Sequence, residues 1–142
     1  MCLIVNSELK VAQEDMVCYK VFKYLCGSLK SPLRGMAYLK NHLYELGKPL
    51  QVDSHHCINE GFHSIIRADD AKKLSDVMGY FYEHYCENKP WCYVVAKCII
   101  PKGTVYAEGL FIYGEKYHSY CSEKIKVVDI VEDGKIICVK EA

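Results

Sequence analysis

The sequence lacks any long apolar run. Its longest apolar segments are residues 2–5 and 94–101, and the second is interrupted by Lys97. Both are far shorter than the roughly 20 apolar residues that a helix needs to cross a bilayer. Residues 1–5 also lack the basic start, longer apolar core and small-residue cleavage site of a secretory signal. We therefore expect a soluble, cytoplasmic protein with no membrane partner.

An excess of charge of either sign is also absent. The 18 Lys and Arg residues balance 18 Asp and Glu residues, and no run of four or more like charges occurs. Proteins that bind the phosphate backbone of nucleic acids usually present a basic patch or stripe. We therefore expect no nucleic acid partner.

The chain has no repeated pair of metal ligands. His55, His56 and Cys57, together with His63, offer side chains that could bind zinc. Zinc sites normally combine two closely spaced ligand pairs, and no second pair of that kind occurs in the sequence. We therefore expect no metal site and interpret these residues as part of a polar loop.

Cysteine, by contrast, is abundant, with nine residues in the chain. The count is odd and the spacing irregular, and intracellular compartments keep thiols reduced. We expect reduced cysteines that are mostly buried as small apolar side chains. A nucleophilic Cys–His pair could be drawn from many combinations, and no local motif selects one of them.

The 142 residues fit a single domain, residues 1–142. Apolar and polar residues alternate over residues 17–24, which predicts a half-buried strand with Lys20 as a polar residue between Tyr19 and Val21. An Asp-Gly pair typical of tight hairpins lies within residues 132–134. The other predicted strands cover residues 60–66, 91–100, 104–107, 110–113, 124–131 and 135–139.

One long helix is predicted after Asp69 and Asp70, whose carboxylates can accept hydrogen bonds at a helix start. Apolar residues then recur at helical spacing: Ala71, Leu74, Val77, Met78, Phe81 and Tyr85. We expect this face to pack on one side of strand 91–100, formed by Val94, Ala96, Cys98 and Ile100. The predicted fold class is α+β, a mainly antiparallel mixed sheet with one long helix packed on one face.

Several segments resemble a group of small uncharacterised proteins encoded by gut bacteria and their phages. The resemblance covers most of the chain and implies a compact domain in a phage or mobile-element setting, with no assigned chemistry. The segments that carry it are residues 19–21, 31–32, 61–64 with 70–71, 97–103 and 120–125.

A second resemblance, to ADP-ribosyltransferase-like domains, implies a chemistry. In that family an aromatic-bearing strand precedes a helix, and a late strand opens on a glutamate near a serine; residues 61–64 before Ala71, and residues 122–127, are similar in order. The resemblance implies nicotinamide dinucleotide (NAD) as cofactor and Glu123 as the residue that fixes a ribose hydroxyl and stabilises the developing positive charge. The other residues that it implies are Tyr19 and His63 as catalytic, and Gly61, Phe62, Ser64 and Ser122 as ligand-binding.

The chain departs from the transferase pattern at two chemically important positions. Tyr19 or Lys20 stands where that family usually has histidine or arginine, and His63 replaces the expected tyrosine. Our leading hypothesis is therefore a small intracellular binding domain, plausibly encoded by a phage, that acts on a protein partner or a small ligand without a cofactor. The alternatives are the NAD-dependent transferase and a structural subunit of an assembly, and the oligomeric state stays open.

Overall fold

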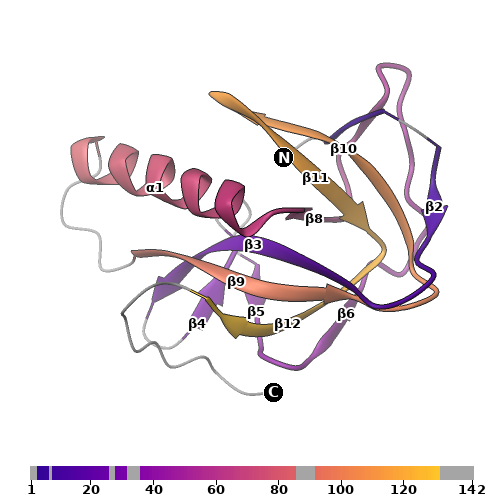
Figure 1. Ribbon diagram of the computed structural model, residues 1–142, viewed down its shortest axis with the longest axis horizontal. Coiled ribbons are helices and arrows are strands. Elements are labelled where there is room, and N and C mark those ends of the chain that lie inside the picture. The colour runs from indigo at the N-terminus through magenta and orange to yellow at the C-terminus, as the bar shows by residue number, and fades with distance from the viewer. Residues whose placement is uncertain (1–2, 7, 26–27, 32–35, 86–91, 132–142) are drawn as a thin grey trace.

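The computed structural model describes residues 3–6, 8–25, 28–31, 36–85 and 92–131, and shows one sheet and one helix (Figure 1). The strands and the helix are β1 (Leu3–Val5), β2 (Lys10–Val11), β3 (Met16–Leu25), β4 (Ser28–Lys30), β5 (Ala37–Tyr38), β6 (Leu43–Glu45), β7 (Cys57–Ile58), β8 (Phe62–Ile65), α1 (Ala68–Tyr85), β9 (Cys92–Ile100), β10 (Val105–Tyr113), β11 (Glu115–Ser122) and β12 (Lys124–Ile130). The predicted combination of a mainly antiparallel sheet and one helix is confirmed for this part of the chain.

Sequence patterns locate most of the long strands. β3, β8, β9 and β12 lie where strands were predicted, whereas the two short strands predicted over 104–107 and 110–113 are one continuous strand, β10. β11 was not predicted. It forms a long antiparallel hairpin with β10 that turns at Gly114, whose φ is 74°. The predicted strand 135–139 and its turn lie outside the described residues.

The order of the main strands in the sheet is β6-β12-β9-β3-β8-β11-β10-β1-β7. β3 and β9 form the longest pairing at the centre, from Met16↔Ile100 to Tyr24↔Cys92. On its other side β3 meets β8 at one residue pair, Tyr19↔Ile65. Beyond that pair the two strands diverge, which leaves space between them.

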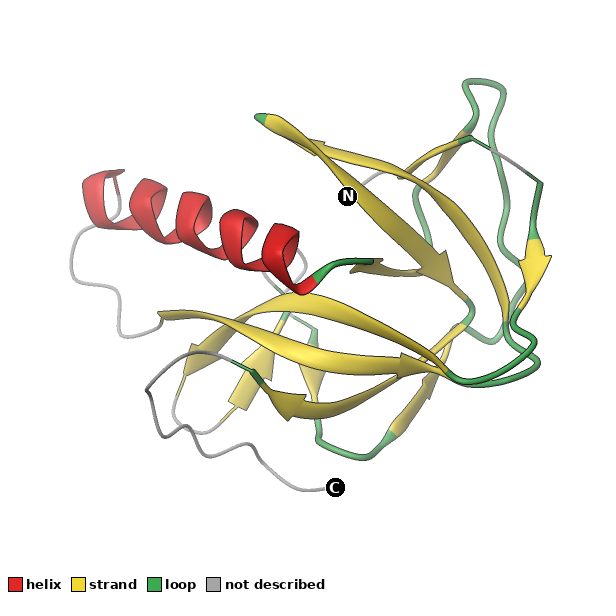
Figure 2. Ribbon diagram, viewed as in Figure 1, coloured by secondary structure: helices red, strands yellow, loops and turns green. Residues whose placement is uncertain are grey.

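The two faces of the central strands contribute to different core clusters, because successive side chains on a strand point to opposite sides. One cluster contains Cys18 and Phe22 of β3 together with the alternate β9 residues Val94, Ala96, Cys98 and Ile100. The other contains Val21, Tyr93, Val95 and the helix residues Ala71, Leu74 and Met78. Figure 2 shows α1 running alongside the sheet.

The helix therefore meets the side of β9 opposite to the one predicted. Leu74 and Met78 share their cluster with Tyr93 and Val95, whereas Val94 and its neighbours on that face belong to the other cluster. Val77 is 43% exposed, so Met78 is the buried member of that pair. The sequence did not distinguish the faces, because both sides of β9 are apolar and both are buried. The side chain of Phe81 lies outside the described residues.

Candidate functional site

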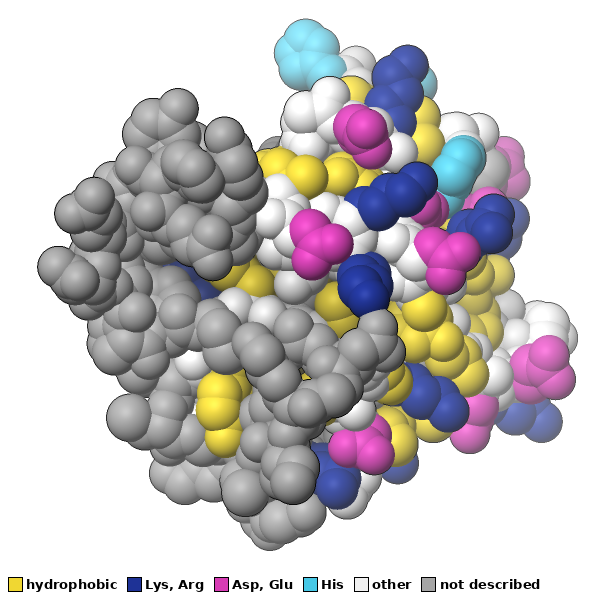
Figure 3. Space-filling view, turned by 60° about the vertical axis from the view of Figure 1, so that its left-hand side comes forward, with side chains coloured by type: hydrophobic (Ala, Val, Ile, Leu, Met, Phe, Trp, Pro, Cys, Tyr) yellow, Lys and Arg dark blue, Asp and Glu magenta, His cyan; other side chains and the backbone are white. Residues whose placement is uncertain are grey.

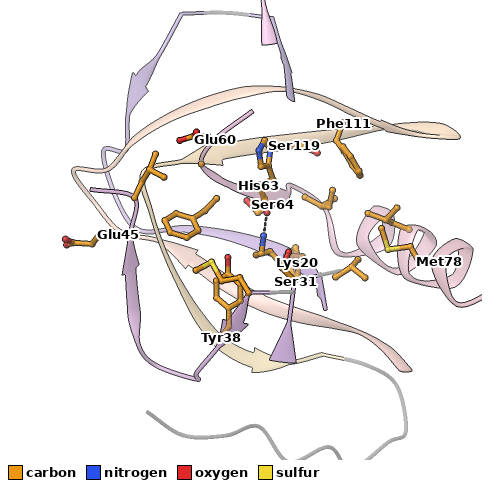
Figure 4. Close-up of a pocket in the computed structure, with 18 residues that line it drawn as sticks. Lys20, Ser31, Tyr38, Glu45, Glu60, His63, Ser64, Met78, Phe111 and Ser119 are labelled. Atoms are coloured by element: carbon orange, nitrogen blue, oxygen red, sulfur yellow. Dashed lines mark hydrogen bonds between the residues drawn. The ribbon is translucent and has the colours of Figure 1, made fainter. Parts of the chain in front are cut away.

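A cavity of about 280 Å³ opens where β3 and β8 diverge. Its wall contains three consecutive residues of β3, Tyr19–Val21, and six consecutive residues, 60–65, the last four of which form β8. Leu74 and Met78 of the helix also line the cavity, and so does Tyr38. Figure 4 shows Met78 on the helix side and Tyr38 close to Lys20. Residues of both core clusters therefore line the cavity. The cavity lies in the gap between β3 and β8, and outside this gap the two strands separate the clusters.

Lys20 is the most unusual residue of this wall. It lies between Cys18 and Phe22 on the inward-facing side of β3, and it is only 8% exposed. Its amine donates a hydrogen bond to the backbone carbonyl of His63, at 2.5 Å between Nζ and O. The sequence analysis treated Lys20 as the polar residue of a half-buried strand, and that interpretation is wrong because this face of β3 is also covered.

Because β3 and β8 diverge, the His63 carbonyl accepts a hydrogen bond from a side chain instead of from a backbone amide. Alternate residues of a strand direct their backbone groups to opposite neighbours. The Ile66 amide donates a hydrogen bond to the carbonyl of His118 in β11, at 3.0 Å. Ile65 pairs with Tyr19 of β3. By this alternation the His63 carbonyl points toward β3, where the ladder has already ended. The Lys20 amine takes the place of the missing backbone donor.

Burial disfavours the charged form of this amine. It lowers the pKa of Lys20, and nearby thiols of Cys98, Cys18 and Cys121 oppose that shift only as anions. Burial itself raises the pKa of Cys18 to about 11 and of Cys121 to about 12. Burial likewise raises the pKa of Cys98 well above its ordinary value. These three thiols, hereafter the buried thiols, are neutral at pH 7 and therefore supply no counter-charge.

Two aromatic rings lie close to the amine and partly compensate its burial. Lys20 Nζ lies 5.8 Å from the centroid of the Phe22 ring and 5.7 Å from that of Tyr38. A cation over a ring gains about 0.5–2 kcal/mol. Transfer of an ammonium to a protein interior costs several kcal/mol even after relaxation. The cost of burial is the larger quantity, so the rings do not restore the ordinary pKa.

The open side of the cavity carries paired charges. Its exposed wall residues include Met36, Glu45 and Glu60. Glu60 forms an ion pair with Lys48, and Glu45 with Lys124 at 3.6 Å. Acidic and basic side chains are also interspersed over the described part of the face in Figure 3. The entrance therefore does not favour a ligand of either charge.

Gly61, which lines the cavity, lies close to the side chain of Cys121. Gly61 has φ of 145°, and a Cβ there would lie 2.8 Å from Leu50 Cδ2 and closer still to Cys121 Sγ. The Cys121 thiol also lies 3.9 Å from His63 Nε2. Cysteine nucleophiles act as thiolates, and a pKa of about 12 keeps this thiol protonated. The pair therefore contributes packing rather than nucleophilic catalysis.

The predicted site residues fall into two groups. Five of them, Tyr19 and the four residues from Gly61 to Ser64, line the cavity. Glu123 and Ser122 are not among the residues that line it. Glu123 Oε2 accepts from the Leu50 amide at 3.3 Å, and the Ser122 hydroxyl donates to the Lys124 carbonyl at 2.9 Å.

Sequence reasoning missed Lys20 and Tyr38 as wall residues. One available indication was the side that Lys20 shares, in the β3 alternation, with the apolar residues Cys18 and Phe22. Tyr38 had none, because the short strand β5 carries it to the cavity through its pairing with β4. Burial raises the pKa of the Tyr38 hydroxyl, which therefore remains protonated at neutral pH.

The histidine-rich loop forms a turn. Asp53 Oδ1 accepts hydrogen bonds from the amides of His55 and Cys57, at 2.8 and 3.0 Å. These bonds hold the pKa of the exposed Asp53 carboxyl below its ordinary value. Within the described ranges, no three His, Cys, Asp or Glu side chains lie close enough together to hold a metal ion.

The helix of the described part is too short or too polar to cross a membrane. No protein family, curated protein or solved structure matches the chain. The cavity and the residues that line it are therefore the features from which a function can be proposed.

Proposed function

We propose that the chain is a binding domain for a small neutral molecule, with an apolar body and one carbonyl group directed at Lys20. The observation that carries this proposal is a buried amine on the wall of a cavity, in contact with a backbone carbonyl and two aromatic rings. Ligand sites typically combine an apolar wall with a few well-placed polar groups. Lys20 supplies such a group here.

The size and charge of the cavity support a small, uncharged ligand. At about 280 Å³ it lies just below the usual range for drug-sized ligands, roughly 300–1,000 Å³. Glu45 and Glu60 at the entrance are each paired with a lysine. An anionic ligand would gain nothing from these paired charges, and it would favour the charged form of the amine, which burial disfavours. A carbonyl oxygen needs only a hydrogen-bond donor, which the Lys20 amine provides in either protonation state.

Benzamide is a suitable probe, because it has an aromatic body and a carbonyl that does not react with amines. We expect it to bind with a Kd of about 1 mM, an interaction of about 4 kcal/mol. Chemical shift changes in protein NMR spectra should map to β3 and β8. Lys20→Met should weaken binding about tenfold, because a hydrogen bond contributes about 1 kcal/mol. Lys116→Met, an exposed change on β11, is the matched control. Equal binding by both variants would contradict the proposal.

The transferase alternative makes a different demand on the same molecule. It requires Glu123 to reach the ligand together with His63, and only His63 lines the cavity. Its test is incubation with labelled NAD and candidate protein acceptors, with Glu123→Gln as the inactive variant. A protein partner, a phage setting and an assembly role remain alternatives of the original hypothesis, and pull-down and sedimentation experiments test them.

A further inference from the structure

We propose that Lys20 captures small aldehydes covalently, as an imine formed within the cavity between β3 and β8. This inference rests on the proposed function, because it uses the same cavity and the same amine. It goes further in naming the class of ligand and the bond that forms.

The geometry of the amine suits a nucleophile. A backbone carbonyl can only accept hydrogen bonds, so the contact with His63 O uses an N–H of Lys20 and not the nitrogen lone pair. In the described ranges, no carboxylate forms an ion pair with Lys20 that would hold it as an ammonium. In the uncharged amine, which burial favours, the lone pair is therefore left for an electrophile that enters the cavity.

The groups around Lys20 supply no negative charge that would hold the amine in its charged form. The ionisable side chains that face it are the buried thiols, on β3, β9 and β11, and Tyr38 on β5. All of them are neutral at this pH, because burial raises each pKa. His63, on β8, faces it through its backbone carbonyl. Burial lowers the pKa of Lys20 itself, and enzymes that use lysine nucleophiles exploit the same desolvation.

The reaction balances without an oxidant or reductant. The Lys20 nitrogen attacks the aldehyde carbon, a C–N bond forms, and the oxygen takes up a proton to give a carbinolamine. The C–O bond then breaks, and the oxygen leaves as water with the two protons that were on the nitrogen. The product is a C=N double bond between Lys20 and the former aldehyde carbon. Imine formation is reversible, so the captured aldehyde can be released by water.

The walls limit the class of aldehyde. The helix side of the cavity carries the apolar side chains of Leu74, Met78 and Phe111, hereafter the apolar end. Figure 4 shows Lys20 between this end and Tyr38, with His63 and Ser64 beside it. An aromatic or branched aldehyde can place its body toward the apolar end while its carbonyl carbon meets Nζ. Sugars and charged aldehydes lack a matching surface there.

Reductive trapping tests this inference on the intact chain. The protein is incubated at pH 7 with benzaldehyde and cyanoborohydride, which reduces the imine to a stable benzyl amine. Peptide mass spectrometry then locates each added benzyl group. We expect Lys20 to be modified about tenfold or more faster than exposed Lys116, because burial favours the uncharged, nucleophilic form of the Lys20 amine. In urea the two rates should become equal.

Two variants and one parallel measurement make the result decisive. Lys20→Met and Lys20→Arg should both abolish the preferential modification, because neither side chain has a primary amine that can form the imine. Modification spread over exposed lysines with Lys20 unmodified, or no modification at all, would overturn the inference. Benzamide binding is measured on the same samples. If benzamide binds and benzaldehyde is not captured, the imine is excluded and the binding proposal stands; if neither occurs, both are excluded.

Discussion

Replacing Lys20 with methionine should make the protein more stable at neutral pH. Methionine has a similar length and fills irregular interior space well. The substitution removes an amine that is 8% exposed and keeps an apolar chain beside Phe22 and Tyr38. Most substitutions in a protein interior destabilise it, so the expected sign is itself informative.

The magnitude follows from two opposing quantities. Burial of an ammonium, or its deprotonation, costs the wild-type protein several kcal/mol on folding. The variant avoids that cost, but it removes the amine that donates to the His63 carbonyl, at a penalty of about 1–3 kcal/mol. Replacement of buried ionic groups by apolar ones of similar volume stabilises by about 1–4 kcal/mol in the favourable cases. We expect a gain of about 1–3 kcal/mol at pH 7.

The pH dependence of this gain distinguishes its cause. The pKa of Lys20 is lower in the folded protein than in the unfolded chain, so between the two values the unfolded chain binds more protons. Wild-type stability therefore rises with pH across that interval. The methionine variant has no such group, so its advantage is largest below the folded pKa and shrinks as pH rises toward 10.

Urea unfolding followed by tyrosine and tryptophan fluorescence, at pH 6, 7.5 and 9.5, measures the difference. Lys116→Met should change stability by less than about 0.5 kcal/mol at each pH, as exposed substitutions usually do. A destabilisation of Lys20→Met by more than about 1 kcal/mol, equal at all three pH values, would refute the reasoning. It would mean that the amine is fully compensated in the folded protein.

Three further changes test other parts of the structure. Gly109→Ala should cost about 3 kcal/mol or more in urea unfolding, because its Cβ would collide with the backbone of Ile4, whereas Gly114→Ala meets open space and should cost only about 1–2 kcal/mol from its positive φ. A short pulse of iodoacetamide on the native protein should label Cys57 well before the buried thiols; equal labelling would contradict their burial. Glu123→Gln should leave benzamide binding unchanged, and a tenfold loss in titration would favour the transferase alternative.

Local sequence patterns predicted which segments form the helix and the strands better than they predicted which strands pair with one another. The helix begins at Ala68, close to its predicted start, and Asp69 and Asp70 lie in its first turn rather than before it. Acidic side chains favour the first turn of a helix, and this preference depends on residues close in sequence. The position of β8 between β3 and β11 depends on residues about 45 to 60 positions away along the chain. No local preference specifies such pairing.

The same limit applies to the cavity. Five of the seven predicted site residues line it, since they lie in two segments that were predicted as strands. The burial of Lys20 was not predicted, because alternation shows which residues share a face and not what covers that face. The distribution of Val94 and Val95 over two clusters could not be predicted for the same reason.

The single pairing between β3 and β8 gives the sheet a seam. On one side lie β6, β12, β9 and β3, and on the other β8, β11, β10, β1 and β7. Within the described residues, the ladder pair Tyr19↔Ile65 and the Lys20 amine connect β3 to β8. A ligand in the cavity would contact strands on both sides of the seam, so it would hold the two halves of the sheet together. Occupancy would then be reported by slower hydrogen exchange in both halves, including amides that the ligand does not contact.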